Sequence, residues 1–179
     1  MSRRATADRG IALIVVMLAM TLLMGLGLAL IMVTMTESAI AGSYADATQA
    51  FYAAEAAVEY TVQEVAARPD WEAVATGQIR STFRDDAVLS VIAPDDTSRA
   101  WTLFAYGRLQ DLLAPVPVRA PYVIAVWIAP EGTGGGALAL LGHAYGANGS
   151  RRAIELIVAR AQESDAGARP RVMAWREVR

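Results

Sequence analysis

The most prominent pattern in the sequence is an uncharged apolar stretch near its start. Residues 11–36 contain no charged side chain, and the polar residues among them are Thr21, Thr34 and Thr36. A helix of these 26 residues, rising about 1.5 Å per residue, would be roughly 39 Å long, against a hydrocarbon core of about 30 Å. The pattern therefore predicts a membrane-spanning segment.

Beyond this stretch the polarity becomes periodic, and no linker interrupts it. Residues 37–67 hold no proline, and apolar residues recur in steps of three and four, which lines one face of a helix. The recurring positions are Ile40, Tyr44, Ala47, Phe51, Ala54, Val58, Val62 and Val65. Arg68-Pro69 predicts the end, because a residue before proline is disfavoured in the α region. We expect one nearly continuous helix of about 55 residues, apolar first and amphipathic later.

Past residue 69 the pattern changes to short strands separated by turn residues. The predicted strands are 87–93, 101–109, 122–129, 137–145, 152–161 and 171–178. Residues 122–129 are apolar on both faces, which is typical of a strand inside a sheet. Turns are predicted at Pro94-Asp95-Asp96 and at Asn148-Gly149, the second a hairpin signal. One long helix packed on a small antiparallel sheet predicts an α+β fold.

Composition narrows the function classes. A chain of 179 residues accommodates one domain plus an anchor. Its net charge of -2 argues against a nucleic-acid binder. The absence of cysteine excludes disulfides, thiolate metal sites and thiol catalysis, and His143 is the only histidine. We therefore expect neither a cofactor nor an enzyme.

The first ten residues allow three interpretations of the apolar stretch. They carry three arginines and one aspartate, so the positive-inside rule keeps the N-terminus cytoplasmic and sends the rest outward, into the periplasm. A secretory signal peptide cut after Ala41 would need an apolar region about twice the usual length. A plain signal anchor is the second interpretation. The third is a prepilin-type leader, residues 1–10, that ends in Gly10 and is cut before Ile11, which leaves the apolar run in the mature protein.

The N-terminal third resembles a known family. The run "RGIALIVVMLAMTLLMGLGLALIMVTMTES", followed by "AIAGSYADATQAFYAAEAAVEY", is similar to the N-terminal region of PilX-type minor pilins of type IV pilus systems. The most specific words are "AG" at Ala41-Gly42 and "FYAAEAAVE" at residues 51–59. A weaker similarity, "MAWREV" at residues 173–178, resembles the family's C-terminal strand. The K-type minor pseudopilins of type II secretion share the leader and part of the helix pattern, so they remain an alternative.

The resemblance implies a pilin-like structural subunit without catalysis. It implies that a prepilin peptidase cuts after Gly10, that Ile11 becomes N-methylated, and that the chain is stored in the inner membrane before it reaches the pilus tip or cell surface. The implied partners are other minor pilins and the major pilin. Most pilins carry a glutamate five residues after the cut, where this chain has Val15. In the family that carboxylate compensates the buried amine of an adjacent subunit, so its absence favours a subunit that initiates or caps assembly.

Four regions are thus expected: the leader 1–10, the transmembrane half of the helix 11–36, its amphipathic half 37–68, and an extracytoplasmic antiparallel β domain 69–179. Phe51, Glu55 and Glu59 are predicted assembly contacts, because small residues around the two glutamates permit close helix approach. The alternative is a solvated face whose alanines serve helix propensity. From a different class, a signal-anchored periplasmic binding domain also stays open.

Other candidate sites are weaker. The glycine-rich residues 132–136 lack the spacing and lysine of a phosphate-binding loop, so they predict a hairpin connection. Asp85-Asp86 and Asp95-Asp96 carry calcium-type ligands, but acidic pairs in turns are usually solvated. His143 is expected to be a satisfied or surface residue of a strand. The four tryptophans are expected in the core or at a domain interface; they are Trp71, Trp101, Trp127 and Trp175.

Overall fold

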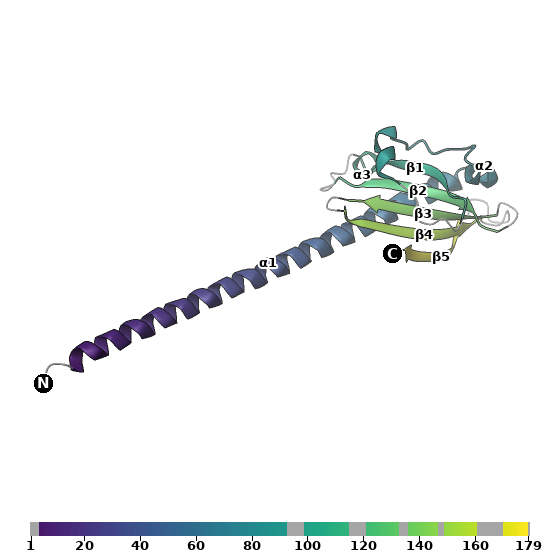
Figure 1. Ribbon diagram of the computed structural model, residues 1–179. Helices are drawn as coiled ribbons and strands as arrows, with labels where there is room; N and C mark the ends of the chain where they lie inside the picture. Colours follow the sequence, from purple (N-terminus) through teal and green to yellow (C-terminus); the bar gives the residue numbers. More distant parts are fainter. Residues whose placement is uncertain are drawn as a thin grey trace. The chain divides into compact units, whose positions relative to one another are not determined.

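The computed structural model describes residues 4–92, 99–114, 121–132, 136–146, 149–160 and 170–178. The chain divides into two compact units, Met1–Tyr44 and Ala45–Arg179, and the first helix contributes to both. The fold is α+β, as predicted, with one long N-terminal helix and a five-stranded antiparallel sheet (Figure 1).

The long helix, α1, spans Arg4–Ala66 without a break, which confirms the predicted continuity. It ends just before Arg68-Pro69, where the residue preceding a proline is disfavoured in the α region. The three threonines of its apolar stretch donate their hydroxyls to carbonyls one turn earlier. These bonds are Thr21 Oγ1 to Leu18 O at 2.9 Å, Thr34 Oγ1 to Leu30 O at 3.0 Å, and Thr36 Oγ1 to Met32 O at 2.9 Å. The apolar stretch therefore satisfies its polar atoms internally, which a lipid environment requires.

The sheet is a simple antiparallel meander in which each strand pairs with the next in sequence. Its strands are β1 Thr102–Arg108, β2 Val123–Pro130, β3 Ala137–Tyr145, β4 Arg151–Ala159 and β5 Arg171–Val178. Three short helices accompany it: α2 Trp71–Ala75, η1 Asp86–Val91 and α3 Leu109–Leu112. Five of the six predicted strands are confirmed: β3 and β5 match the predicted bounds, and the ends of the other three differ by one or two residues.

The prediction of a strand at 87–93 is wrong, because residues 86–91 form the 3-10 helix η1. The side chain of Asp85 accepts a hydrogen bond from the Ala87 N–H at 3.1 Å and caps the helix. The Val88 N–H donates to Asp85 O at 3.1 Å. An aspartate that caps a helical turn thus prevails over the strand propensity of the valines. The turn predicted at Pro94-Asp95-Asp96 lies outside the described residues, as do Asn148 and residues 133–135 of the predicted loops.

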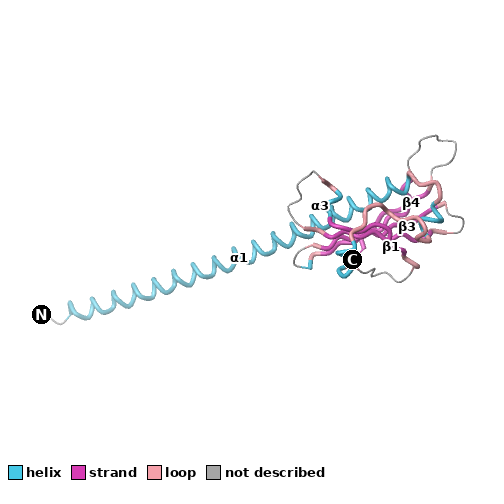
Figure 2. Tube along the Cα trace, turned by 90° about the horizontal axis from the view of Figure 1, so that it is seen from above, coloured by secondary structure: helices cyan, strands magenta, loops and turns pink. Residues whose placement is uncertain are grey.

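The C-terminal part of α1 runs along the sheet (Figure 2). Small residues line the face that packs on it. The most buried positions of this face are Ala50, Ala53, Ala54, Ala57 and Thr61. At Gly142 of β3 an added Cβ would clash with the Val58 side chain and lie 3.3 Å from the carbonyl oxygen of Ala54. The alanines therefore permit close approach between α1 and the sheet of its own domain. This role differs from the two predicted for them, which are helix propensity and close contact with another helix.

The other face of the sheet is buried as well. It holds a second apolar cluster to which η1 contributes Val88. The other buried members are Tyr106, Ala125, Trp127, Leu141 and Ala153. Because both of its faces are covered, β2 is buried from Ile124 to Ala129. This confirms the interpretation of residues 122–129 as a strand inside the sheet.

Candidate functional site

The first candidate surface is the apolar part of α1, described within the unit Met1–Tyr44. Every side chain of residues 11–44 is exposed, including Ile11 and Val15, which are 62% and 58% exposed. In the described part of the chain, α1 is long enough and apolar enough to cross a membrane. Burying apolar surface gains about 25 cal/mol per Å². An exposed apolar area of this size therefore requires lipid or protein against it.

The predicted processing bond lies inside this helix. Since α1 begins at Arg4, the peptide bond between Gly10 and Ile11 is helical. A peptidase that takes its substrate in an extended form would have to unwind this part of the helix before cutting the predicted bond. Glycine lowers the cost of unwinding by about 1 kcal/mol relative to alanine, which suits Gly10 to this position.

The second candidate surface is an aromatic cluster on the unit Ala45–Arg179, formed by Phe51, Tyr52 and Trp175. The ring of Phe51 lies edge to face with Trp175, with centroids 6.0 Å apart, and with Tyr52 at 5.6 Å. Tyr52 and Trp175 are 62% and 50% exposed, and Phe51 is half-buried. The sequence predicts Phe51 as an assembly contact but not its grouping with Tyr52 and Trp175, because only the fold brings β5 beside α1.

The four tryptophans, predicted in the core or at a domain interface, differ in burial. Trp71 and Trp127 are buried, which confirms the prediction for them. Trp101 is half-buried against the second apolar cluster. Trp175 is half exposed at the sheet edge, so it lies outside the core, and its predicted place at an interface stays a prediction.

The glutamates of the amphipathic helix have different surroundings. Glu55 and Glu59 are exposed, and among the described residues neither forms an ion pair; Glu59 accepts a long hydrogen bond of 3.4 Å from Gln63. Glu64 instead accepts from Ser81 Oγ at 2.5 Å, from the Thr82 N–H at 3.1 Å and from Arg68 at 3.1 Å. Glu64 therefore fastens the chain that follows the helix, whereas Glu55 and Glu59 leave their carboxylates available to a partner or to water.

A buried polar network lies on the sheet face opposite α1. Glu155 of β4 is buried and accepts from Arg176 Nε at 2.7 Å, and Arg99 Nη1 lies 3.2 Å from its other oxygen. Arg99 also pairs with Glu131 at 2.8 Å, which ties it to the end of β2. A buried carboxylate needs such partners to offset its desolvation, so this network is a structural cross-link. The sequence offered no sign of it, because its members are far apart in the chain.

His143 belongs to the same face. Its Nδ1 lies 3.1 Å from the Tyr145 hydroxyl and 2.9 Å from Arg151 Nη2, and its ring packs against Trp127 with centroids 4.9 Å apart. The residue is buried, so of the two predicted possibilities it is the satisfied histidine and not a surface one.

The first predicted acidic pair serves structure in the described part of the chain. Asp85 caps η1, and Asp86 accepts a hydrogen bond from the Tyr106 hydroxyl, which itself accepts one from Arg84 Nη2 at 2.8 Å. Burial, followed by the hydrogen bond to Asp86, raises the pKa of Tyr106. Among the described residues no group of three histidine or acidic side chains could hold a metal ion. Asp95-Asp96 lies outside them.

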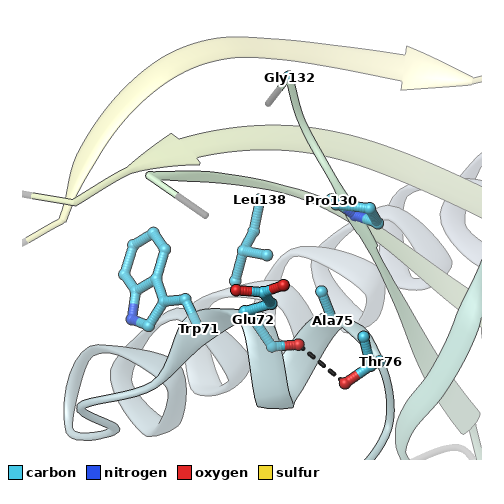
Figure 3. Close-up of a pocket in the computed structure, with 7 residues that line it drawn as sticks. All are labelled: Trp71, Glu72, Ala75, Thr76, Pro130, Gly132 and Leu138. Atoms are coloured by element: carbon cyan, nitrogen blue, oxygen red, sulfur yellow. Dashed lines mark hydrogen bonds between the residues drawn. The ribbon is translucent and has the colours of Figure 1, made fainter. Parts of the chain in front are cut away.

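Figure 3 shows a pocket where α2 meets the ends of β2 and β3. Its volume is about 200 Å³, and its lining is Trp71, Glu72, Ala75, Thr76, Pro130, Gly132 and Leu138. The Thr76 hydroxyl donates to the backbone carbonyl of Glu72 at 2.9 Å and so is already engaged. Ligand pockets usually measure about 300–1,000 Å³. Among the described lining residues Glu72 is the one titratable side chain, and they contain no paired nucleophile and base.

Comparison with known proteins agrees with the N-terminal resemblance. Residues 9–59 match the PilX N-terminal family model, which confirms the similarity predicted from the sequence. The match covers less than a third of the chain and ends within the part of α1 that packs on the sheet. No curated protein and no solved structure gave a significant match. The PilX N-terminal region and the exposed apolar helix together indicate a pilus-related, membrane-anchored chain.

Proposed function

We propose that this chain, with its PilX-type N-terminal region, is a minor pilin that initiates or caps assembly of a type IV pilus and catalyses no reaction itself. The observation that carries the proposal is the continuity of α1, whose exposed apolar half leads into a half that forms part of the domain core. An ordinary membrane anchor needs no such continuation. A subunit that must join its domain to a bundle of helices does.

Maturation follows from the leader. A prepilin peptidase cuts after Gly10 on the cytoplasmic side, and Ile11 becomes the N-methylated start of the mature chain. The apolar residues 11–36 keep the subunit in the inner membrane with the domain in the periplasm, and later pack beside other pilin helices. The three arginines of the leader support this orientation.

Position in the fibre follows from Val15. Among the residues 11–36 no carboxylate is available to compensate the amine of a neighbouring subunit, and an unpaired charge in an apolar bundle is costly. A subunit at the tip has no preceding subunit whose amine it must meet. The absence of a carboxylate is therefore least costly when the subunit lies at the tip of the fibre.

Lateral contacts are proposed at Phe51, Glu55 and Glu59, with other minor pilins or the major pilin as partners. The two glutamates are exposed, and aromatic side chains such as Phe51 contribute large contact area at interfaces. A partner helix that places arginine or lysine opposite Glu55 and Glu59 would match this surface.

The deciding experiment is the intact mass and N-terminal sequence of the protein from membranes of cells with and without prepilin peptidase. We expect a chain that starts at Ile11 and carries one added methyl group, and an uncut chain when the peptidase is absent. A Gly10→Val variant serves as control and should stay uncut in both strains. A start at Gly42, or an uncut chain in cells with active peptidase, would contradict the proposal.

A further inference from the structure

The two edges of the sheet differ in how their outer backbone groups are paired. At β1 the outer edge is covered: the Tyr106 N–H donates to Phe83 O at 3.1 Å, and the Asp85 N–H donates to Tyr106 O at 2.9 Å. The Phe83 ring also lies against Gly107, where an added Cβ would be 2.7 Å from it. A further strand along β1 would have to displace residues 83–85 from Tyr106.

At β5 the outer edge is open. Among the described residues, no backbone group outside β4 hydrogen-bonds to it, and every residue from 171 to 177 is exposed. Three large apolar side chains on this strand are half exposed or more: Val172, Met173 and Trp175. An edge strand with exposed apolar residues is a template for a further strand, because its outward backbone groups lack partners.

From this asymmetry we propose that β5 is a docking edge that accepts an extended segment of a different protein as a sixth strand. The segment carries apolar side chains toward Met173 and Trp175 and carboxylates toward Arg171 and Arg176. The inference does not depend on the pilus role; it uses only the geometry of the sheet and the charges at its edge.

A second copy of this chain is not the occupant proposed. Its β1 cannot pair with β5, because residues 83–85 already occupy the outer side of β1. Two β5 strands paired antiparallel would be related by a two-fold axis perpendicular to the sheet. Such a pair is the competing arrangement, and the light-scattering measurement below distinguishes it.

The arginines specify the chemistry of the incoming segment. Arg171 is exposed, and among the described residues it forms no ion pair. The guanidinium of Arg176 holds Glu155 yet its side chain remains 67% exposed, and a guanidinium has five N–H donors, so it can accept a second carboxylate. Beside it, Arg99 and Trp175 border a pocket of about 340 Å³ that can take an incoming side chain. Edge charges of one sign also discourage unspecific pairing.

The test uses the full-length protein in detergent and a fluorescein-labelled peptide of eight alternating valine and glutamate residues, the length of β5. Fluorescence anisotropy should show saturable binding. A peptide N-methylated at two adjacent central residues, which blocks both of its edges, should bind about tenfold more weakly. A peptide with lysine in place of glutamate should also bind about tenfold more weakly.

Two charge reversals identify the edge. Arg171→Glu should abolish the preference for glutamate over lysine, and Arg80→Glu, exposed and placed before β1, should leave it unchanged. Circular dichroism verifies that both variants are folded. Equal binding of the N-methylated peptide, an unchanged preference in Arg171→Glu, or a dimer of the chain by light scattering that Arg171→Glu dissociates would overturn the proposal.

Discussion

The two halves of α1 have the same secondary structure and opposite surroundings. Residues 11–44 expose every side chain, and most of them are large and apolar. Residues 45–66 carry alanines at the positions that contact the sheet, and these are almost completely buried. The difference shows that side-chain size, and not hydrophobicity alone, decides what a helix packs against: large residues gain from a deformable environment such as lipid, small ones from a close, fixed surface.

The largest expected effect is on membrane insertion, which should depend on the apolar half of α1 and not on the packed half. Leu23→Arg places a charge in the middle of the apolar half and should cost about 3 kcal/mol of insertion, since arginine is strongly disfavoured at the centre of a bilayer. We expect most of the protein to become extractable from membranes at alkaline pH. Tyr52→Arg, equally exposed but in the packed half, should remain membrane-bound. Extraction of both variants, or of neither, would remove the distinction.

The next effect separates the halves by packing. Gly142→Ala should destabilise the domain by about 2 kcal/mol, because its Cβ has to displace Val58 against the carbonyl of Ala54. Urea unfolding followed by tryptophan fluorescence measures this. The control Gly25→Ala has nothing within 4 Å of the new Cβ and should leave the domain's unfolding midpoint unchanged.

A rescue variant sharpens that measurement. Val58→Ala removes the methyl groups that the new Cβ meets, so the double variant with Gly142→Ala should recover part of the loss. Losses that simply add in the double variant would show that the helix is not held at this crossing by the contact described here.

A smaller effect distinguishes the glutamates. Glu64→Gln should lower the free energy of unfolding by about 1 kcal/mol, because the bonds from Ser81, Thr82 and Arg68 lose their charge assistance. Glu55→Gln should change it by less than about 0.5 kcal/mol, as expected for an exposed side chain. An equal loss in both variants would indicate that Glu55 has a structural partner.

The smallest effect concerns pH. Burial and the bond to Asp86 raise the pKa of Tyr106 in the folded state, so the protonated form is favoured by folding. The resulting stability is fully present below pH 10 and is lost as pH rises through the higher folded value. Tyr106→Phe should lose less stability than the parent as the pH rises above about 10. Burial also raises the pKa of Tyr122, which is present in both proteins, so the difference between the two unfolding curves reports Tyr106 alone.

Periodicity was sufficient to predict α1 and five strands, because each depends on local spacing and on clear breaks such as Arg68-Pro69. It failed at η1, where a single capping aspartate outweighs the valines. It could not show the Glu155 network or which alternative holds for Trp175, because their surroundings arise from pairing of β4 with β5 and from contacts across about 20 residues or more. The leader and the contact residues of the site remain predictions, since their role lies in other molecules.

The buried alanine face of α1 has a mechanical consequence. Tension applied along the helix does not peel the domain away residue by residue, because the helix lies along the sheet and its contacts at Ala50, Ala54, Ala57 and Val65 are loaded together, in shear. Extraction of the helix would have to shear these contacts at once and pull Val58 past Gly142. The domain is thus built so that a pull on its anchor meets the resistance of the whole core.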